Sequence, residues 1–508
     1  MLPLSPLWTS CLAALFAINT GVASAQSPPN PNATWPLQSF QSTEIKTPFL
    51  NVTKNGKTEL GYLFLNPQNM GTGHPAIYED DGQLVWQGPE GSTFSFEPQM
   101  LDGQPVLLYW DGLTNSTGYG YGSMRVLNSS YQQIHEVTIP GDDFKTIYEP
   151  ETFPSYLDFH EGFITEDGSM ILAAVNVTEA DLQSVGGPED GWVLDALVYE
   201  IDIETNEVLF RWSAREHVSE IPLNLSRKPL SGAGASEKDP WNYIHMNSIA
   251  KYGDSYLVSS RYACSVFLIS SNGTLIWHLN GIDGGDFEMG PDTTFCYQHE
   301  VRLENMSEDK VTLTAHNNEN SDFTNQTKAT TGLALDLDLQ NKKVSLNRKL
   351  WNAQRPVVSR AQGSYQSLGN GHVLLSHGVI PVIEEYDEHG AIVMDARFGY
   401  DNAASTYRTY RHSWVGVPKT KPSVKACRPT EDGEVVVYVS WNGATGVQSW
   451  KLFASSDDGE LEEIKTEPRN GFETIVRAEN AGDKFVVAAV GGPNDGGKSD
   501  VVTVGSCN

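Results

Sequence analysis

Three histidines occupy nearly the same place in successive repeats of the sequence. His160, His245 and His299 each precede, by eight to ten residues, a Gly or Asp turn that begins a new strand pattern. In a closed radial array of β-sheets, equivalent positions of neighbouring sheets meet at one central axis. We therefore expect the three imidazoles to converge at the starts of inner strands, where they could serve as nucleophile, base or hydrogen-bond donor.

Further polar residues are expected near these histidines. Arg261 ends the strand pattern that follows His245, and a guanidinium suits bidentate capture of sulfate, phosphate or carboxylate, or an ion pair with an acid. Asn247 follows His245 by two residues, so it points to the same side of a strand and could position an imidazole or a substrate oxygen. His316 and His377, at the far ends of two expected inner strands, are candidates for lining the same substrate-binding mouth.

Other chemistries find less support. Three imidazoles plus water would suit catalytic zinc, so that alternative stays open, although we expect neither a metal nor a cofactor. The Gly492–Ser499 segment fits a phosphate-loop pattern, but a short strand follows it instead of a helix, which predicts a turn. The sequence has no Gly-x-Ser-x-Gly motif, so a hydrolase of that type would lack its nucleophile.

The elements that must position these residues are predicted to be strands. Short β-branched and aromatic runs bounded by Gly, Asn and Asp recur from Leu60 onward, and helical periodicity is nearly absent, which predicts an all-β protein. A hairpin that often ends in Trp recurs at irregular spacing. Its copies are Ala76–Trp86, Met124–Val137, Leu197–Trp212, Val266–Trp277, Leu333–Leu350 and Val382–Phe398. Six hairpins predict a six-bladed β-propeller.

A second strand repeat runs out of phase with the hairpins. Its copies begin at Gly168, Gly253, Asp309 and Gly371, and each strand ends in small or polar residues. We expect these copies to be neighbouring inner strands of successive blades.

The chain divides into three expected parts. Residues 1–25 carry no charged side chain, contain the apolar stretch Leu12–Ile18 and end in Ala-Ser-Ala, which predicts a cleaved signal peptide. Residues 26–418 are expected to form the propeller with an N-terminal extension. Residues 419–508 are expected to form a small C-terminal β segment, either a separate sandwich or strands that close the propeller. No later apolar run is long enough to span a bilayer, so we expect a secreted protein that is not membrane-bound after signal removal.

The cysteines and glycosylation motifs also favour the secretory pathway. Signal removal takes away Cys11 and leaves an even number of cysteines, for which three pairings are possible. We favour Cys264–Cys296 and Cys427–Cys507, because each bridge then stays within one structural unit. The expected N-glycosylation sites are Asn32, Asn51, Asn115, Asn128, Asn176, Asn224, Asn272, Asn305 and Asn325.

Composition excludes some partners. The chain of 508 residues has 34 Lys and Arg against 64 Asp and Glu, a net charge of −30, which repels phosphate backbones and makes nucleic-acid binding untenable. The hydrophobic fraction of 39% is enough for a folded core. The sequence leaves the oligomeric state undetermined.

Several segments resemble the arylsulfotransferase-like family in its secreted fungal form. They are Asp239–Ile249, Leu257–Arg261, Gly273–Trp277, Gln298–Glu300 and Glu384–Phe398. The resemblance runs from about Phe153 to Pro418, and its most specific part is His-x-Asn-Ser-Ile together with Ser-Ser-Arg. It implies a six-bladed propeller with the active site at the central channel.

The resemblance also implies roles for individual residues. In bacterial members a histidine accepts a sulfuryl group from a phenolic sulfate ester and passes it to another phenol, independently of the nucleotide donor PAPS. His299 looks like that nucleophile, while His160, His245 and Arg261 look like the groups that hold the sulfate oxygens and move the phenolic proton. Cationic donors around the equatorial oxygens would stabilise such a transition state.

Two other functions stay open at this point. The same pocket could dehydrate a hydroxymethyl phenol or tropolone to a quinone methide and guide a hetero-Diels–Alder cyclisation in fungal secondary metabolism, which requires acid–base groups and an apolar cavity. Alternatively, a non-catalytic propeller could bind a glycan or a protein, in which case His160, His245 and Arg261 need not share a pocket. For the enzymatic functions, the expected partner is an aromatic small molecule.

Overall fold

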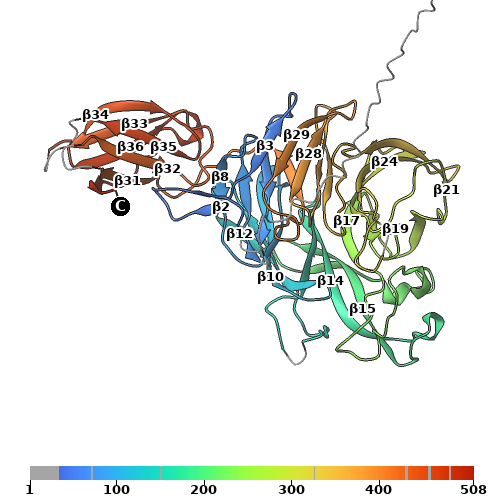
Figure 1. Cartoon of the computed structure of the whole chain (residues 1–508). Helices are drawn as coiled ribbons and strands as arrows, with labels where there is room; N and C mark the ends of the chain where they lie inside the picture. The colour runs from blue at the N-terminus through green and yellow to red at the C-terminus, as the bar shows by residue number, and fades with distance from the viewer. Residues whose placement is uncertain are drawn as a thin grey trace, which may run out of the picture.

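The computed structural model describes residues 34–69, 72–148, 151–324, 327–429, 433–455, 459–479 and 482–507. The expected signal peptide and the sequons at Asn32 and Asn325 lie outside these ranges. The described chain is all-β, as predicted, and its helical residues form short 3-10 turns (Figure 1). These turns are η1 (Gln183–Val185), η2 (Arg215–His217), η3 (Leu223–Leu225) and η4 (Gly492–Asn494).

The N-terminal sheets bring distant segments together. One sheet has the order β30-β4-β7-β8, with β30 (Thr409–His412), β4 (Tyr62–Leu65), β7 (Ala76–Tyr78) and β8 (Leu84–Gln87). Two small antiparallel pairs accompany it, β1 (Leu37–Ser39) with β2 (Lys46–Pro48) and β5 (Gln68–Asn69) with β6 (Thr72–Gly73). Because β30 pairs with β4, a late strand completes a sheet begun near the N-terminus.

The next eight strands form one sheet of two halves. The first half is β9 (Thr93–Leu101), β10 (Gln104–Thr114), β11 (Gly120–Leu127) and β12 (Gln133–Val137). The second is β13 (Leu157–Ile164), β14 (Ser169–Ala180), β15 (Gly191–Asp202) and β16 (Val208–Ser213). A single residue pair, Gly122 with Leu157, joins β11 to β13, so each half is a four-stranded unit.

Three further sheets follow in chain order. The first is β17 (Met246–Tyr252), β18 (Ser255–Ser260), β19 (Ser265–Ser270) and β20 (Leu275–Asn280). The second is β22 (His299–Glu304), β23 (Lys310–Asn317), β24 (Thr331–Asp338) and β25 (Lys343–Leu350), with β21 (Glu288–Met289) beside β25. The third is β26 (Ser364–Ser367), β27 (Val373–Ser376), β28 (Val382–Tyr386) and β29 (Ile392–Arg397), with β3 (Asn51–Lys54) at its edge.

The first strands of these units adjoin one another. Contacts run from β9 to β13, β17, β22, β26 and β30 in turn, and β30 contacts β9. All six predicted hairpins are present as antiparallel pairs. The strands β14, β18, β23 and β27, expected to be neighbouring inner strands, are second in their sheets, each paired with the strand that precedes it. Each is therefore flanked by a strand on both sides, and its place in a blade stays a prediction.

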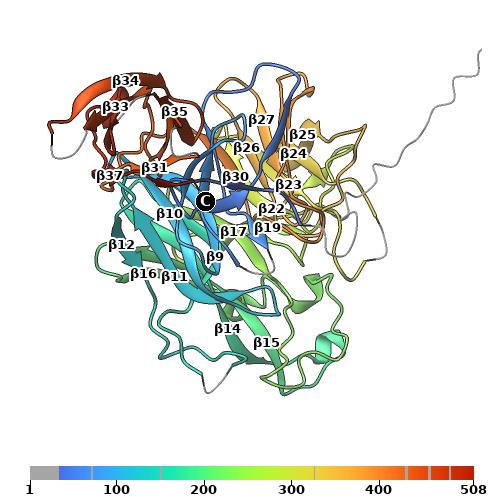
Figure 2. The same cartoon turned by 60° about the vertical axis from the view of Figure 1, so that its left-hand side comes forward.

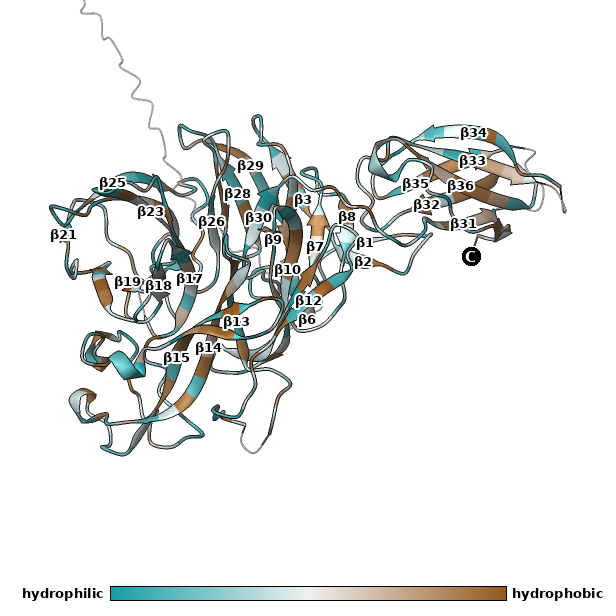
Figure 3. Cartoon of the chain, turned by 180° about the vertical axis from the view of Figure 1, so that it is seen from behind, coloured by the Kyte–Doolittle hydropathy of each residue, from teal (hydrophilic) through white to brown (hydrophobic). Residues whose placement is uncertain are grey.

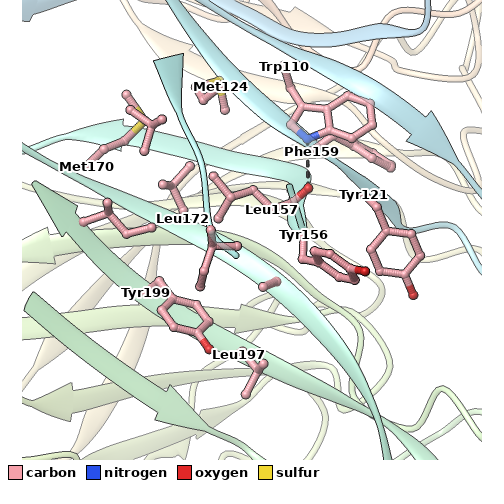
Figure 4. Close-up of a cluster of buried hydrophobic side chains, with 14 of the residues drawn as sticks. Trp110, Tyr121, Met124, Tyr156, Leu157, Phe159, Met170, Leu172, Leu197 and Tyr199 are labelled. Atoms are coloured by element: carbon pink, nitrogen blue, oxygen red, sulfur yellow. Dashed lines mark hydrogen bonds between the residues drawn. The ribbon is translucent and has the colours of Figure 1, made fainter. Parts of the chain in front are cut away.

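The largest buried cluster fills the space between the two halves of the eight-stranded sheet (Figure 4). Trp110 on β10 is fully buried, and its indole N–H donates to the Leu157 carbonyl at 3.0 Å. Met124, Leu172 and Leu197 pack in the same cluster. In Figure 3 the apolar stretches, coloured brown, follow the strands. Burial of the apolar side chains of this cluster holds β13, the strand that carries His160, in place.

The C-terminal strands form a lobe to one side of the other sheets (Figures 1 and 2). One of its sheets contains β35 (Glu473–Ala478), β32 (Val435–Ser440), β31 (Ser423–Arg428) and β38 (Gly505–Ser506). The other contains β34 (Glu462–Pro468), β33 (Ser449–Ser455), β36 (Lys484–Val490) and β37 (Val502–Thr503). The two sheets share a core of their own, whereas the boundary at residue 418 stays a prediction.

Both predicted disulfides are present, Cys264–Cys296 and Cys427–Cys507. Among the described sequons, the exposed asparagines are Asn51, Asn224, Asn272 and Asn305, and the partly buried ones are Asn115, Asn128 and Asn176. Their glycosylation stays a prediction. Within the described residues, no helix has the length and apolarity needed to cross a membrane.

Candidate active site

The three repeated histidines meet in one buried cluster. His160 lies in β13, His245 directly precedes β17, and His299 is the first residue of β22. The rings of His160 and His245 have centroids 4.9 Å apart and are perpendicular. The three side chains also affect one another electrostatically, together with Arg261. The convergence expected from the repeat is therefore present.

Each of these strands departs from regular pairing close to its histidine. The register with the second strand shifts between Leu157 and Gly162 on β13, between Met246 and Ser248 on β17, and between His299 and Arg302 on β22. Such irregularities redirect side chains and are frequent beside active sites.

A buried carboxylate holds His160. Asp158 is fully buried, and its Oδ2 lies 2.5 Å from His160 Nδ1. Because a carboxylate accepts hydrogen bonds, Nδ1 carries the proton and the neutral ring has its lone pair on Nε2. The ring of Phe159 stacks on His160 at 4.2 Å.

His245 has the opposite tautomer. The Asn242 amide N–H donates to His245 Nδ1 at 3.1 Å, and the same amide nitrogen donates to the Thr117 carbonyl at 3.1 Å. Since Nδ1 accepts, the neutral ring carries its proton on Nε2 and can donate to a substrate oxygen. His245 has a φ of 46°, a conformation that costs about 1–2 kcal/mol for a non-glycine residue.

His299 is contacted at both ring nitrogens. Its Nδ1–H donates to Asn318 Oδ1 at 2.7 Å, so the lone pair is on Nε2, the arrangement that a histidine nucleophile requires. The Gln362 backbone N–H donates to that Nε2 at 3.0 Å. In the structure as it stands, the nucleophilic lone pair is therefore covered by a backbone donor.

Arg261 contributes positive charge to the cluster, as does the nearby Lys228. One terminal nitrogen donates to the Arg360 carbonyl at 2.6 Å, and the other donates to the Tyr262 hydroxyl at 3.2 Å. Its Nε–H is buried without a hydrogen-bond partner. No described carboxylate forms an ion pair with this guanidinium, which leaves its charge available to an anion.

The environment keeps two of the rings uncharged. Burial lowers the pKa of His245 well below its ordinary value, and positive charge on Arg261, or on His160 when that ring is protonated, lowers it further. Burial also lowers the pKa of His299, with Arg261 again contributing, and the hydrogen bond to Asn318 only partly opposes this shift. A neutral imidazole at neutral pH is what nucleophilic attack needs.

The residue before His299 is anchored to the preceding sheet, which contains β17, β18 and β19. The fully buried Gln298 amide donates to Ser259 Oγ and to the carbonyls of Ser260 and Ser265, at 3.0–3.1 Å. Asn247 donates to the Gln298 carbonyl at 2.7 Å. Asn247 thus joins β17 to the residue before His299, and its expected contact with a substrate oxygen stays a prediction.

A buried ion cluster lies beneath the histidines. Glu161, next to His160, is fully buried and accepts from Arg408 at 3.0 Å and from Arg302 at 3.0 Å. Arg408 also donates to the carbonyls of His160 and Asn247 at 3.0 Å. These bonds fix the inner strands β13, β17, β22 and β30 relative to one another.

His316 and His377 lie behind the cluster. His316 pairs with His299 across β22 and β23, and its Nε2 lies 3.3 Å from His377 Nδ1. His377 Nε2 lies 3.2 Å from the Glu384 carboxylate. Both rings are at most 1% exposed, so their expected role in lining the substrate mouth stays a prediction. Burial lowers the pKa of His316 to about 3.

Two cavities lie near the cluster without including its histidines. One, of about 900 Å³, is lined by Arg355, Arg360 and Glu384 among others. The other, of about 420 Å³, is lined by Glu97, Glu300 and neighbouring residues. Within the described ranges, no group of three or more His, Cys, Asp or Glu side chains is arranged to hold a metal ion.

Sequence reasoning found the three histidines and Arg261 but missed their partners. Asp158, Asn242 and Asn318 set the tautomers and were not singled out. Asp158 could have been found, because a residue two positions before His160 lies on the same side of the strand. Asn318 directly follows β23 and Asn242 lies in a loop, and no local pattern connects them to the rings they contact.

Comparisons with known proteins bear on the same region. A family model described as Arylsulfotransferase (ASST) matches residues 97–399, which is more than half of the chain and includes all three histidines and Arg261. A search of curated proteins gave no match.

Solved structures with a similar course of the chain have low sequence identity. A protein of unknown function from Bacteroides caccae is 12% identical, with 69% of this chain and 98% of that chain covered and a TM-score of 0.39. An α-L-arabinanase from Penicillium chrysogenum, complexed with arabinobiose, is 10% identical, with 76% and 94% covered and a TM-score of 0.34. These similarities carry no functional argument.

Proposed function

The chain belongs to the arylsulfotransferase family, and from that premise we propose that it transfers a sulfuryl group from an aromatic sulfate ester to a phenol through a histidine, independently of PAPS. The observation that carries the proposal is the set of three tautomers in the cluster. His299 and His160 have lone pairs on Nε2, whereas His245 has a donor there. Transfer through a covalent intermediate needs these three functions.

The first half-reaction uses His299 as nucleophile. Its Nε2 attacks the sulfur, and the bond from sulfur to the phenolic oxygen breaks, so that this oxygen leaves with the bonding electron pair as a phenolate. The donors that we propose for the sulfuryl oxygens, on which charge develops, are His245 Nε2–H and Arg261. Preorganised donors of this kind are each worth about 3–4 kcal/mol in other enzymes.

Substrate binding requires a rearrangement of one segment. Arg360 accepts from Arg261 through its carbonyl, and Gln362 donates to His299 Nε2 through its N–H. Both contacts come from residues 360–362. We expect this segment to release the two side chains when the sulfate ester binds, so that each turns to the substrate.

The direct test follows release of a chromogenic phenol from its sulfate ester, with and without a second phenol as acceptor. We expect acceptor-dependent turnover by the wild type and none by His299→Ala. His389→Ala is the matched control, because its side chain is 82% exposed and outside the cluster. Loss of turnover in the control, or full turnover by His299→Ala, would contradict the proposal.

The wild type and His299→Ala also distinguish sulfuryl transfer from the cyclase alternative. A pericyclic step guided by the shape of the pocket should lose only part of its rate in His299→Ala, whereas sulfuryl transfer should lose all of it. A folded wild type that releases no phenol, but cyclises phenolic or tropolone precursors with polyenes, would favour the cyclase. The cluster itself speaks against a binding-only propeller, which does not require these residues to converge.

The proposal also includes the architecture of the protein and its location. We infer six blades, supported by the succession of contacts from β9 through β30 and back to β9, and a C-terminal unit over residues 419–508. We also infer secretion after removal of residues 1–25, with which the two disulfides are compatible. The partner is an aromatic small molecule.

A further inference from the structure

A second positively charged side chain, Lys228, lies near Arg261, and both lie over the same aromatic ring. Lys228 Nζ is 5.0 Å from the centroid of the Tyr262 ring, and the guanidinium carbon of Arg261 is 5.1 Å from it. The Arg227 N–H donates to the Tyr262 carbonyl at 2.7 Å. This backbone bond ties the loop that carries Lys228 to the connection that carries Arg261.

Neither cation has a carboxylate partner. In the part of the chain that the structure describes, no Asp or Glu forms an ion pair with Lys228 or with Arg261. Burial lowers the pKa of Lys228, the charge of Arg261 lowers it further, and the charge of Asp239 only partly opposes this shift. Two like charges without a carboxylate between them repel each other, and an anion bound beside both would remove that repulsion.

The aromatic side chains beside this pair suit the ring of a phenolic ester. Tyr262, Tyr297 and Phe323 form an aromatic group, in which the Phe323 ring is edge-on to both tyrosines with centroids 5.5 Å apart. Tyr262 in turn lies 5.0 Å from the ring of His245. Both tyrosines are buried, whereas Phe323 and Lys228 are partly exposed. The aromatic group therefore connects the surface with the histidine cluster.

We propose that Lys228 and the aromatic group capture an aryl sulfate before its sulfur reaches His299. The sulfate group binds beside Lys228 and then moves to Arg261, while the aromatic ring contacts Phe323. This docking site rests on the sulfuryl transfer proposed above and adds to it the residues that select an anionic aromatic donor. No covalent bond changes at this step, so Lys228 is a binding residue.

A partly exposed cation at this place has a specific effect in so acidic a protein. The net charge of −30 repels an aryl sulfate at a distance, and Lys228 provides local attraction on the way to the buried Arg261. A hydrogen bond to a charged group contributes about 10- to 100-fold in affinity. The acceptor phenol is neutral and gains nothing from this charge, so Lys228 should affect the donor alone.

The first test measures binding without transfer. The probe 4-nitrobenzenesulfonate has a carbon–sulfur bond in place of the ester oxygen, so it keeps the anion and the ring of a donor but cannot transfer its sulfuryl group. In isothermal titration calorimetry we expect Lys228→Met to raise the Kd of this probe about 10- to 100-fold, and Lys228→Arg to recover most of the affinity. Phe323→Ala should weaken binding of the probe and leave binding of inorganic sulfate unchanged.

Lys342→Met is the matched control. Lys342 Nζ lies 4.9 Å from the Phe287 ring centroid, and this lysine is also partly exposed. It precedes β25 at the end of the sheet where Asp338 lies, whereas His299 is at the other end. The control variant should bind the probe as the wild type does. An unchanged Kd in Lys228→Met, or an equal loss in the control, would overturn the docking site.

Steady-state kinetics separate the docking site from the reaction that it serves. With an aryl sulfate and a phenol acceptor, Lys228→Met should raise the donor KM about 10- to 100-fold and leave kcat and the acceptor KM near their wild-type values. Turnover with an unchanged donor KM would overturn the docking site and leave sulfuryl transfer standing. A wild type that binds the probe through Lys228 but releases no phenol would overturn sulfuryl transfer and support the docking site.

Discussion

Three chemically identical imidazoles acquire different functions from one partner each. A carboxylate puts the proton of His160 on Nδ1, an amide donor puts that of His245 on Nε2, and an amide oxygen puts that of His299 on Nδ1. The amide orientations are fixed by further bonds, since Asn318 also donates to the Gln362 carbonyl at 3.0 Å. The hydrogen-bond partner decides what each ring can do.

Asn318→Ala tests this at the level of one residue. The variant removes the acceptor of His299 Nδ1–H, so the ring loses its fixed tautomer and orientation, and we expect phenol release to slow by about 10- to 100-fold, the usual cost of losing a partner that orients a functional His. Stopped-flow measurement of the first half-reaction gives the rate.

Asn494→Ala is the control for loss of a buried amide. Asn494 is 4% exposed and donates to the carbonyls of Gly416 and Thr445, far along the chain from the cluster. Its replacement should lower stability and leave the rate of phenol release intact. A wild-type rate in Asn318→Ala would show that this amide does not position the nucleophile.

Among the elements, the strands can be predicted from the sequence better than the connections between them. Hairpins such as Val266–Trp277 were predictable because both strands are apolar and the turn is short. The order of the strands within each sheet was not predictable. The turn at Gly253 and the equivalent turns lead into the second strand of a sheet, and the local sequence of such a strand resembles that of a first strand. Segment 360–362, which contacts Arg261 and His299, is an irregular connection, and nothing in its residue types predicts those contacts.

The Cys264–Cys296 disulfide links two connections that carry the site. Cys264 follows Arg261 by three residues and Cys296 precedes His299 by three. The bridge closes a separation of 32 residues, for which removal costs about 3–4 kcal/mol by the loop-entropy relation. We expect the double Ser variant to lose this unfolding free energy in urea and to lose activity under conditions where it is still folded.

The second disulfide provides the comparison. Replacing Cys427 and Cys507 by Ser should lower stability by a similar amount, because that bridge closes a separation of 80 residues. Activity of the folded protein should be unaffected, since the C-terminal lobe carries no residue of the cluster. Equal loss of activity in the two variants would contradict the assigned role of Cys264–Cys296.

The ion cluster under the site should dominate the coupling between inner strands. In Glu161→Gln, Arg302 and Arg408 lose their shared buried counter-ion, and we expect unfolding free energy to fall by about 3–5 kcal/mol. Glu288→Gln breaks an exposed pair with Lys343 and should change stability by less than about 1 kcal/mol. Denaturant unfolding of both variants makes the comparison, and equal small effects would be inconsistent with a coupling role.

For the molecule as a whole, the net charge repels small anions, and only the positive charge near the cluster attracts them. The net charge is −30, so an aryl sulfate is repelled until it comes within reach of Arg261. Raising the ionic strength screens the distant charges more than the buried ones. The net charge predicts that nucleic acid is not a partner, but the composition could not reveal a site beside the buried Arg261.

Stability should fall in mild acid because histidines are buried without charge. Burial lowers the pKa of His74 to about 4, whereas an unfolded histidine titrates near 6.5. As pH falls below 6.5 the unfolded chain binds a proton that the folded chain does not, so His74 alone removes about 2–3 kcal/mol of unfolding free energy by pH 4.5.

Paired unfolding curves at pH 7.5 and 4.5 measure this contribution. His74→Gln should lose less stability than the wild type between the two pH values, by about the same 2–3 kcal/mol. His389→Gln, at an 82% exposed position, should match the wild type. An unchanged pH dependence in His74→Gln would show that this residue is not the source.

Covalent capture of the intermediate is the sharpest test of sulfuryl transfer through His299. The wild type is mixed with an aryl sulfate in the absence of acceptor, quenched at alkaline pH and digested for mass spectrometry of the histidine-containing peptides. We expect one sulfuryl group on His299, absent from His299→Ala and discharged when a phenol is added before quenching. Turnover without a sulfuryl group on any histidine, or its accumulation on His160 instead, would contradict transfer through His299.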